Sequence, residues 1–247
     1  MPSPSSRKTI LFDLMGTCLD WHTTVVSSLP HRIPAALRSE LALVWRQAYF
    51  NSNRERIHRD MAPEDIDDTL RRTLASLLDE DGRFSTFRSC FDDEGSGVVV
   101  DGCIDAWHHQ RAWADVGPTL KALKDKGYEL IVHANGTTRL QLDLMRSSGL
   151  GEWFDMLLSS ELLGVYKPKV ESYEMALKLL KRKPDECCMV AAHIEDLVGA
   201  RNTGIKGIYI RRWSDDIEEN MAVVEESCDV FLNKGMQGLV EAIQSLR

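Results

Sequence analysis

The sequence predicts an α/β protein with a doubly wound parallel sheet and a helical segment inserted after the first strand. Five short runs are apolar throughout, which is typical of parallel strands covered on both faces by helices. Helical patterns separate the later runs, and this alternation predicts a Rossmann-like sheet with right-handed crossovers. The first two runs are separated by a long interval that contains helical patterns but no comparable apolar run.

The predicted strands are, in chain order, Ile10–Phe12, Leu130–Val132, Cys188–Ala191, Gly207–Ile210 and Val230–Leu232. Helical patterns follow several of them. Gly127 and Gly149 stand at the ends of two such patterns, where a glycine is the usual C-terminal cap.

The long interval contains helical stretches over Leu41–Tyr49 and Ile66–Leu78. We expect residues 21–100 to form a helical cap domain over the carboxyl edge of the sheet, and residues 1–20 with 101–247 to form the core domain. The first eight residues lack the apolar core of a secretory signal and are predicted to be a disordered lead-in.

Composition narrows the class of protein. The chain is 43% hydrophobic and 28% charged, as ordinary globular proteins are, and its net charge of -8 disfavours binding to nucleic acid. The sequence has no run of about eighteen apolar residues, so it predicts no membrane span. The six cysteines show no Cys-x-x-Cys spacing, so we expect reduced thiols and a cytoplasmic location. The expected partner is a small-molecule substrate.

Asp13 directly follows the first predicted strand and precedes Gly16. Ligands of open α/β sheets bind just beyond the carboxyl ends of the strands, so this carboxylate is a candidate reactive group. Taken alone, it could equally be the N-cap of a following helix.

Three further polar sites favour the reactive role. Asn135 follows the second predicted strand, and His193 and Asp196 follow the third, while Lys167 precedes a helical pattern. A lysine near an aspartate keeps the carboxylate ionised, and an asparagine can donate to an oxygen that develops charge. By contrast, His22, His108 and His109 have no partner at metal-ligand spacing and are expected to be structural.

These segments resemble, in order, the four motifs of the haloacid dehalogenase superfamily, and they extend over almost the whole chain. The pattern is most similar to the (S)-2-haloacid dehalogenases. The matching segments are Phe12-Asp13-x-x-Gly16-Thr17-x-x-Asp20, Arg46 within 43–47, Asn135-Gly136, Lys167-Pro168 with Tyr173, and Asp196-x-x-Gly199-Ala200-Arg201.

The resemblance implies a role for each matching residue. Asp13 would be the nucleophile that displaces halide and forms an aspartyl ester. Lys167 and Asp196 would then help water to cleave the ester. Substrate-binding roles, including the orientation of carboxyl groups and the stabilisation of halide or a substrate anion, would fall to Met15, Thr17, Arg46, Asn135, Tyr173 and His193. The resemblance implies no cofactor and no metal, and it makes a homodimer plausible.

Two departures disfavour a phosphatase. Phosphatases of the superfamily carry an acid at the position of Met15, and methionine cannot transfer a proton. Ala192 stands where their magnesium-binding acid would be, which leaves Asp13 and Asp196 as a thin oxygen set for Mg²⁺.

Other departures separate the chain from active dehalogenases, which usually carry Ser at Ala134, Ser at Ala191 and Asn at His193. Fewer donors near Asp13 should raise the pKa of its carboxyl group. His193 could act as an acid or base near neutral pH, or could simply pack at the strand end. Together with Met15, these residues resemble a fungal dehalogenase-like subgroup.

Three functions therefore stay open. The leading one is a hydrolase that uses Asp13 on a small electrophile such as a 2-haloacid. The second is a Brønsted-acid enzyme that opens, rearranges or cyclises an epoxide in fungal secondary metabolism, as in quinolone-alkaloid biosynthesis. The third is a catalytically silent binding protein, against which the retention of the whole residue set argues.

Overall fold

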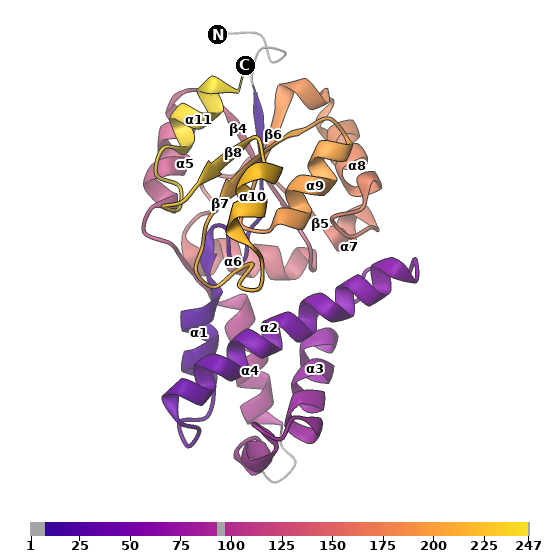
Figure 1. The fold of residues 1–247 in the computed structure, drawn as a ribbon, viewed down its shortest axis with the longest axis vertical. Coiled ribbons are helices and arrows are strands. Elements are labelled where there is room, and N and C mark those ends of the chain that lie inside the picture. The colour runs from indigo at the N-terminus through magenta and orange to yellow at the C-terminus, as the bar shows by residue number, and fades with distance from the viewer. Residues whose placement is uncertain (1–7, 93–96, 247) are drawn as a thin grey trace.

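A computed structural model of the chain describes residues 8–92 and 97–246 (Figure 1). Its centre is a six-stranded parallel sheet in the order β5-β4-β1-β6-β7-β8. The strands are β1 (Thr9–Phe12), β4 (Glu129–Ala134), β5 (Met156–Ser159), β6 (Cys187–Ala191), β7 (Lys206–Ile210) and β8 (Val230–Leu232). The α/β class and all five predicted strands are confirmed.

The sequence did not predict β5, which lies at one edge of the sheet. Its apolar run Met156-Leu157-Leu158 is as long as that of β8, but it contains no β-branched or aromatic residue, so it resembles the leucine-rich helical patterns around it. A two-stranded antiparallel ribbon of β2 (Leu19–Asp20) and β3 (Arg111–Ala112) lies outside the main sheet.

Helices cover both faces of the sheet because side chains alternate along each strand. Ile10 and Phe12 face one apolar layer, which includes residues of α5 (Val116–Asp125) and α11 (Leu239–Ser245). Leu11 faces the other, formed with α8 (Val170–Leu180), α9 (Ile194–Asn202) and α10 (Met221–Ser227). The doubly wound arrangement follows from this alternation.

Four helices gather at one end of the molecule (Figure 1). They are α1 (Trp21–Ser28), α2 (Ala35–His58), α3 (Ile66–Glu80) and α4 (Val98–His108), and a short 3-10 helix spans Ser85–Cys90. Helix α4 packs against α1 and α3 and extends this group beyond residue 100. Stacked rings of Trp21 and Trp107, whose centroids are 5.5 Å apart, join its first and last helices.

The chain order places a topological switch beside β1. After β1 the chain adds β4 and β5 on one side, and it then crosses over to add β6, β7 and β8 on the other. The carboxyl ends of β4, β1 and β6 therefore open a crevice, which lies beside the helical group. Ligands of doubly wound sheets bind at such a point. The remaining helices are α6 (Thr138–Ser148) and α7 (Ser160–Leu163).

Three further predictions concern the cysteines, membrane spans and the N-terminal segment. The six cysteines carry free thiols, and four of them are buried. None of the helices within residues 8–92 and 97–246 is long and apolar enough to cross a membrane. The predicted disordered lead-in lies, except for Lys8, outside the described residues.

Candidate active site

Asp13 lies at the carboxyl end of β1, where its backbone N–H donates to the carbonyl of Val190 at 3.0 Å. The chain then turns through Gly16, whose φ of +88° favours glycine. This turn brings Thr17 back, so that its hydroxyl donates to Asp13 Oδ2 at 2.7 Å. The Thr17 oxygen in turn accepts the Ala192 N–H at 2.8 Å, which fixes the orientation of the hydroxyl.

Lys167 lies between two carboxylates. Its Nζ donates to Asp13 Oδ1 at 2.9 Å and to Asp196 Oδ2 at 2.6 Å, and the side chain is only 2% exposed. Burial alone would lower the pKa of Lys167, but the two carboxylates outweigh it and raise this pKa above its ordinary value. The lysine is therefore charged.

Asp13 is ionised because of these neighbours. Burial would raise the pKa of its carboxyl group, but Lys167 and His193 hold this pKa far below its ordinary value. The expected rise of the Asp13 pKa is therefore wrong. Besides the Lys167 ammonium and the Thr17 hydroxyl that the sequence already predicted, the carboxylate has the imidazole of His193 beside it, which offsets the donors absent at Ala134 and Ala191.

Asp196 differs from Asp13 although both contact the same lysine. Burial, opposed by Lys167, leaves its pKa raised above the ordinary value. The hydroxyl of Tyr173 donates to the backbone carbonyl of Asp196 at 2.8 Å and anchors the first turn of α9. The two carboxylates that flank Lys167 thus have pKa values pushed apart, which is typical of a nucleophile beside a base.

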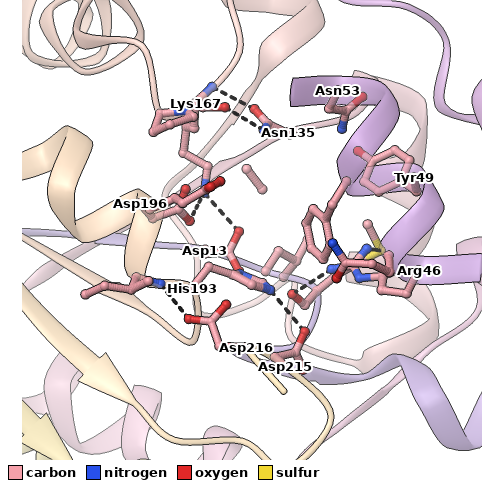
Figure 2. Close-up of a pocket in the computed structure, with 18 of the residues that line it drawn as sticks. Asp13, Arg46, Tyr49, Asn53, Asn135, Lys167, His193, Asp196, Asp215 and Asp216 are labelled. Atoms are coloured by element: carbon pink, nitrogen blue, oxygen red, sulfur yellow. Dashed lines mark hydrogen bonds and ion pairs between the residues drawn. The ribbon is translucent and has the colours of Figure 1, made fainter. Parts of the chain in front are cut away.

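His193 bridges Asp13 to a third carboxylate, that of Asp215. Its Nδ1 lies 3.2 Å from Asp13 Oδ2, and its Nε2 lies 3.0 Å from Asp215 Oδ1 (Figure 2). Burial would lower the pKa of His193, but the two carboxylates raise it well above its ordinary value. The imidazole is therefore charged and is not merely packed at the strand end.

Arg46 from α2 faces this cluster from the helical group (Figure 2). It is 4% exposed, and its Nη2 donates to the carbonyl of Met15 at 3.3 Å. Its guanidinium lies 4.5 Å from the ring centroid of Phe50, and its Nε has no hydrogen-bond partner. None of the ion pairs within the described residues includes this buried cation, although, against the effect of burial, its charge also helps to lower the pKa of Asp215 from a greater distance. An incoming anion could therefore pair with it directly.

A pocket opens between the strand ends and α2. Asp13, Lys167, His193 and Asp196 line it on the side of the sheet, with Asn135 beside them. The wall formed by α2 and α6 combines apolar and polar side chains. The apolar ones, with the ring of Tyr49, are Leu43, Phe50, Ile57, Leu140 and Leu144, and the polar ones are Arg46, Gln47, Asn53, Arg54 and Gln141. An organic molecule with an anionic group and an apolar part would match this lining.

The predicted site residues lie together in the structure, but some line the pocket and others are buried behind its wall. Met15, Arg46, Asn135 and His193 line the pocket with the three predicted catalytic residues. Thr17 and Tyr173 are fully buried behind its wall and act on Asp13 and on the backbone of Asp196. Asn135 exchanges two hydrogen bonds with the backbone of Lys167, at 2.9 and 3.0 Å, and so fixes the segment that carries the lysine.

A metal ion would fit this site poorly. Ligand atoms of Asp13, His193 and Asp196 lie within 4.8 Å of one another. However, the Lys167 ammonium already contacts both carboxylates, and the charged ring of His193 offers no lone pair. We therefore assign no metal ligands here.

Asp215 is the residue that the sequence reasoning missed. It is fully buried and accepts hydrogen bonds from Trp21 Nε1 at 3.2 Å and from the Ser214 hydroxyl at 2.7 Å. A signal was present, because residues 211–216 follow the predicted strand Gly207–Ile210 and carry polar groups, as the other strand-end sites do.

Comparisons with known proteins agree with this geometry. The family model described as haloacid dehalogenase-like hydrolase matches residues 7–204. The (S)-2-haloacid dehalogenase of Pseudomonas sp. strain YL is 30% identical over 216 residues, which cover 86% of each chain. (S)-2-haloacid dehalogenase 4A of Burkholderia cepacia is 28% identical over 220 residues, or 88% of each chain.

A solved structure extends the likeness to three dimensions. The L-2-haloacid dehalogenase PA0810 matches with a TM-score of 0.79 and 28% identity, over 97% of this chain and 100% of that one. Fold, site and sequence thus point to one group of enzymes. The chain belongs to the haloacid dehalogenase-like hydrolase family.

Proposed function

We propose that this protein hydrolyses a small organic electrophile such as a 2-haloacid, with Asp13 as the nucleophile. One observation carries the proposal: Asp13, held ionised by Lys167 and His193, lines a pocket that Arg46 also lines, and none of the ion pairs among the described residues involves Arg46. A carboxylate nucleophile and a separate cation for a departing halide or a substrate anion are the two parts that such a displacement needs.

The first step joins Asp13 to the substrate. One carboxylate oxygen attacks carbon 2, the carbon–halogen bond breaks, and the halide leaves with the bonding electrons. Lys167, Thr17 and His193 orient the carboxylate by three contacts of 2.7 to 3.2 Å. Rigid placement of this kind lowers the entropic part of the barrier.

The second step releases the product. Water attacks the carboxyl carbon of the Asp13 ester, and Asp196 accepts a proton from it. The raised pKa of Asp196 suits a general base, since proton transfer is most efficient when the pKa lies close to the working pH. Lys167 keeps Asp196 in place at 2.6 Å. The 2-hydroxy acid leaves, the second proton of the water is released from the new carboxyl group to solvent, and Asp13 returns to the carboxylate.

The two other candidate functions find less support. Acid-catalysed epoxide opening by Asp13 needs a protonated carboxyl group, whereas Lys167 and His193 favour the ionised one. A silent binding protein would have no need of three charged groups around Asp13, because buried charges are costly to maintain.

A single turnover in ¹⁸O-labelled water tests the proposal. Excess enzyme is mixed with each enantiomer of 2-chloropropionate and 2-bromopropionate, halide is measured, and the protein is analysed by peptide mass spectrometry. The hydroxyl oxygen of the product comes from Asp13, so we expect the label in the peptide that contains Asp13 and not in the first product formed. Label found only in the product would mean direct attack by water.

Variants and a chelator complete this test. Asp13→Asn should abolish halide release. Asp60→Asn is the matched control, because Asp60 also pairs with a lysine, Lys169, but its side chain is 89% exposed. EDTA should leave halide release unchanged. Absence of halide release from the whole panel would reject the proposal.

A further inference from the structure

The His193–Asp215 pair has no counterpart in the usual dehalogenase pattern, which has Asn at the position of His193. Asp215 lies 22 residues along the chain from His193, and its side chain is 0% exposed. Gly16 leaves the room that this carboxylate occupies, because a Cβ on Gly16 would collide with it. The turn that carries the Asp13 motif is thus built around Asp215.

The contacts define the protonation state of His193 by geometry. Both ring nitrogens face carboxylate oxygens, Nδ1 at 3.2 Å from Asp13 and Nε2 at 3.0 Å from Asp215. Carboxylates only accept hydrogen bonds, and only the imidazolium has two N–H donors. A neutral ring would turn a lone pair toward one of the two carboxylates.

The two oxygens of Asp13 are not equivalent. Oδ2 accepts a hydrogen bond from the Thr17 hydroxyl and lies 3.2 Å from His193 Nδ1 in an ion pair, so two donor groups already face it. Oδ1 accepts from Lys167 alone among the described residues and keeps one lone pair that can attack. An ester formed through Oδ1 leaves Oδ2 as the ester carbonyl oxygen, still facing His193 and Thr17.

Formation of the ester removes the negative charge of Asp13. A histidine that depended on Asp13 alone would then lose its counterion. Asp215 remains, buried and hydrogen-bonded by Trp21 and Ser214, and its contact with His193 does not depend on the state of Asp13. Asp215 can therefore keep the positive charge on His193 in the covalent intermediate.

We propose that His193 is a catalytic residue for the hydrolytic step, and that Asp215 is the positioning residue that keeps it charged. The inference rests on the proposed function. When water attacks the carboxyl carbon, the π electrons of the carbonyl move to Oδ2, and His193 Nδ1–H and the Thr17 hydroxyl stabilise this oxyanion. As Oδ2 forms the double bond again, the bond between the carboxyl carbon and Oδ1 breaks. The leaving alkoxide takes the proton that Asp196 had accepted from water.

Other charged groups near His193 support this assignment. Asp216 follows Asp215, and its carboxylate accepts the Ile194 N–H at 2.7 Å. Asp196 lies one helical turn after His193, and its interaction with His193 is attractive. The ring of Phe50 covers the imidazole edge-on with centroids 5.2 Å apart, so the charge is shielded from water on that side.

The test separates formation of the ester from its hydrolysis. His193→Ala, His193→Asn and Asp215→Asn are mixed with excess 2-bromopropionate, and halide bursts and intact protein mass are followed over time. Loss of one oxyanion donor typically slows a step by about 10²- to 10³-fold. We therefore expect His193→Ala to release a stoichiometric burst of halide and to accumulate the ester. His193→Asn, which retains a donor without the charge, should accumulate less.

Asp215→Asn gives a readout that a purely structural role would not move. The amide in this variant cannot neutralise the imidazolium, so His193 should lose its proton at a lower pH than in the wild type. The decrease in the rate of ester hydrolysis as the pH rises should therefore begin at a lower pH. Titration of the His193 ring by NMR should show a matching decrease of its pKa.

The possible outcomes are distinct. The inference is overturned if the wild type turns over while His193→Ala hydrolyses the ester at an unchanged rate and Asp215→Asn keeps the wild-type pH profile. The proposed function would then still stand. If the wild type releases no halide and forms no ester, the proposed function fails and the inference fails with it.

Discussion

Within residues 8–92 and 97–246, two histidines each bridge two aspartates, and they have different surroundings. His193 lies between Asp13 and Asp215 in the pocket. His108, at the end of α4, lies between Asp67 of α3 at 2.9 Å and Asp143 of α6 at 3.0 Å. We call these the site bridge and the hinge bridge, since the second joins the helical group to the sheet domain.

The two rings are equally exposed, at 12% each, so burial of the imidazole does not separate them. The exposure of the carboxylates separates the two bridges. Those of the site bridge are 9% and 0% exposed, whereas those of the hinge bridge are 37% and 24% exposed. Water can replace the partners of the hinge bridge but not those of the site bridge. A protonated histidine can thus take part in catalysis only where its counterions are buried and lie beside a pocket.

The largest effect should follow from removing Lys167, whose charge stabilises the site bridge. Lys167→Met leaves Asp13 and Asp196 buried without their shared ammonium. We expect halide release to fall by at least about 10³-fold and the free energy of unfolding by about 3–5 kcal/mol, as when one partner of a buried ion pair is removed. Steady-state kinetics and urea denaturation measure both.

Lys169→Met is the matched control for this change. Lys169 pairs with Asp60, whose side chain is 89% exposed, so solvent screens this pair and its loss should scarcely change the free energy of unfolding. Equal losses of halide release and of stability in the two variants would mean that the buried cluster tolerates an unpaired charge as well as the surface does. The proposed difference between buried and exposed pairs would then be wrong.

A smaller effect is expected from the arginines that accompany the two bridges. Arg46 lies over Phe50 in the pocket without a carboxylate, whereas Arg139 pairs with Asp143 of the hinge bridge. Arg46→Lys removes the planar donor set that an anion needs, so kcat/KM should fall by about 10- to 10²-fold, which corresponds to about 1.5–3 kcal/mol. Arg139→Lys should change it less than about twofold. A comparable fall in both would argue against an anion site at Arg46.

These contrasts show which features the sequence could predict. The strands β1, β4, β6 and β7 were predictable because residues buried on both faces form continuous apolar runs. The edge strand β5 escaped because its run of methionine and leucine lacks the β-branched and aromatic residues that are typical of strands. The rule that ligands bind at strand ends placed Asp13, Asn135 and Asp196 together before any contact was known.

Contacts between distant segments were not predictable in this way. Trp21 and Asp215 are 194 residues apart in the chain and meet only through packing of the helical group on the sheet. A count of lost donors suggested a raised pKa for Asp13 because it did not include the charged ring of His193 beside the carboxylate, and the structure reverses that sign. The chemistry of a strand-end residue depends on the neighbours that tertiary packing supplies.

The hinge bridge should affect stability and not turnover. The hydrogen bond with Asp67, opposed by partial burial and helped by Asp143, raises the pKa of His108 above its ordinary value. A raised pKa in the folded state stabilises the protein fully below the unfolded pKa of about 6.5, and this stabilisation is lost as the pH rises through the folded pKa. His108→Gln should therefore cost about 1 kcal/mol near pH 6, and less at higher pH.

Urea denaturation of the wild type and His108→Gln at several pH values measures this difference, while halide release should stay within about twofold of the wild type. A loss of turnover comparable to that of His193→Ala would mean that the hinge bridge also controls the chemistry. The distinction between the two bridges would then be wrong.

The smallest expected effect concerns the two carboxylates of the hinge bridge, which should contribute differently to stability. Asp143 pairs with Arg139 and Arg146 as well as His108, whereas Asp67 contacts His108 and is the more exposed of the two carboxylates. Since a solvated pair is screened, Asp67→Asn should cost at most about 0.5 kcal/mol, and Asp143→Asn should cost more because it loses three partners. Urea midpoints measured at low and high salt compare them. If Asp67→Asn were the more damaging change, exposure of the carboxylate would not be what sets the strength of a histidine bridge in this protein.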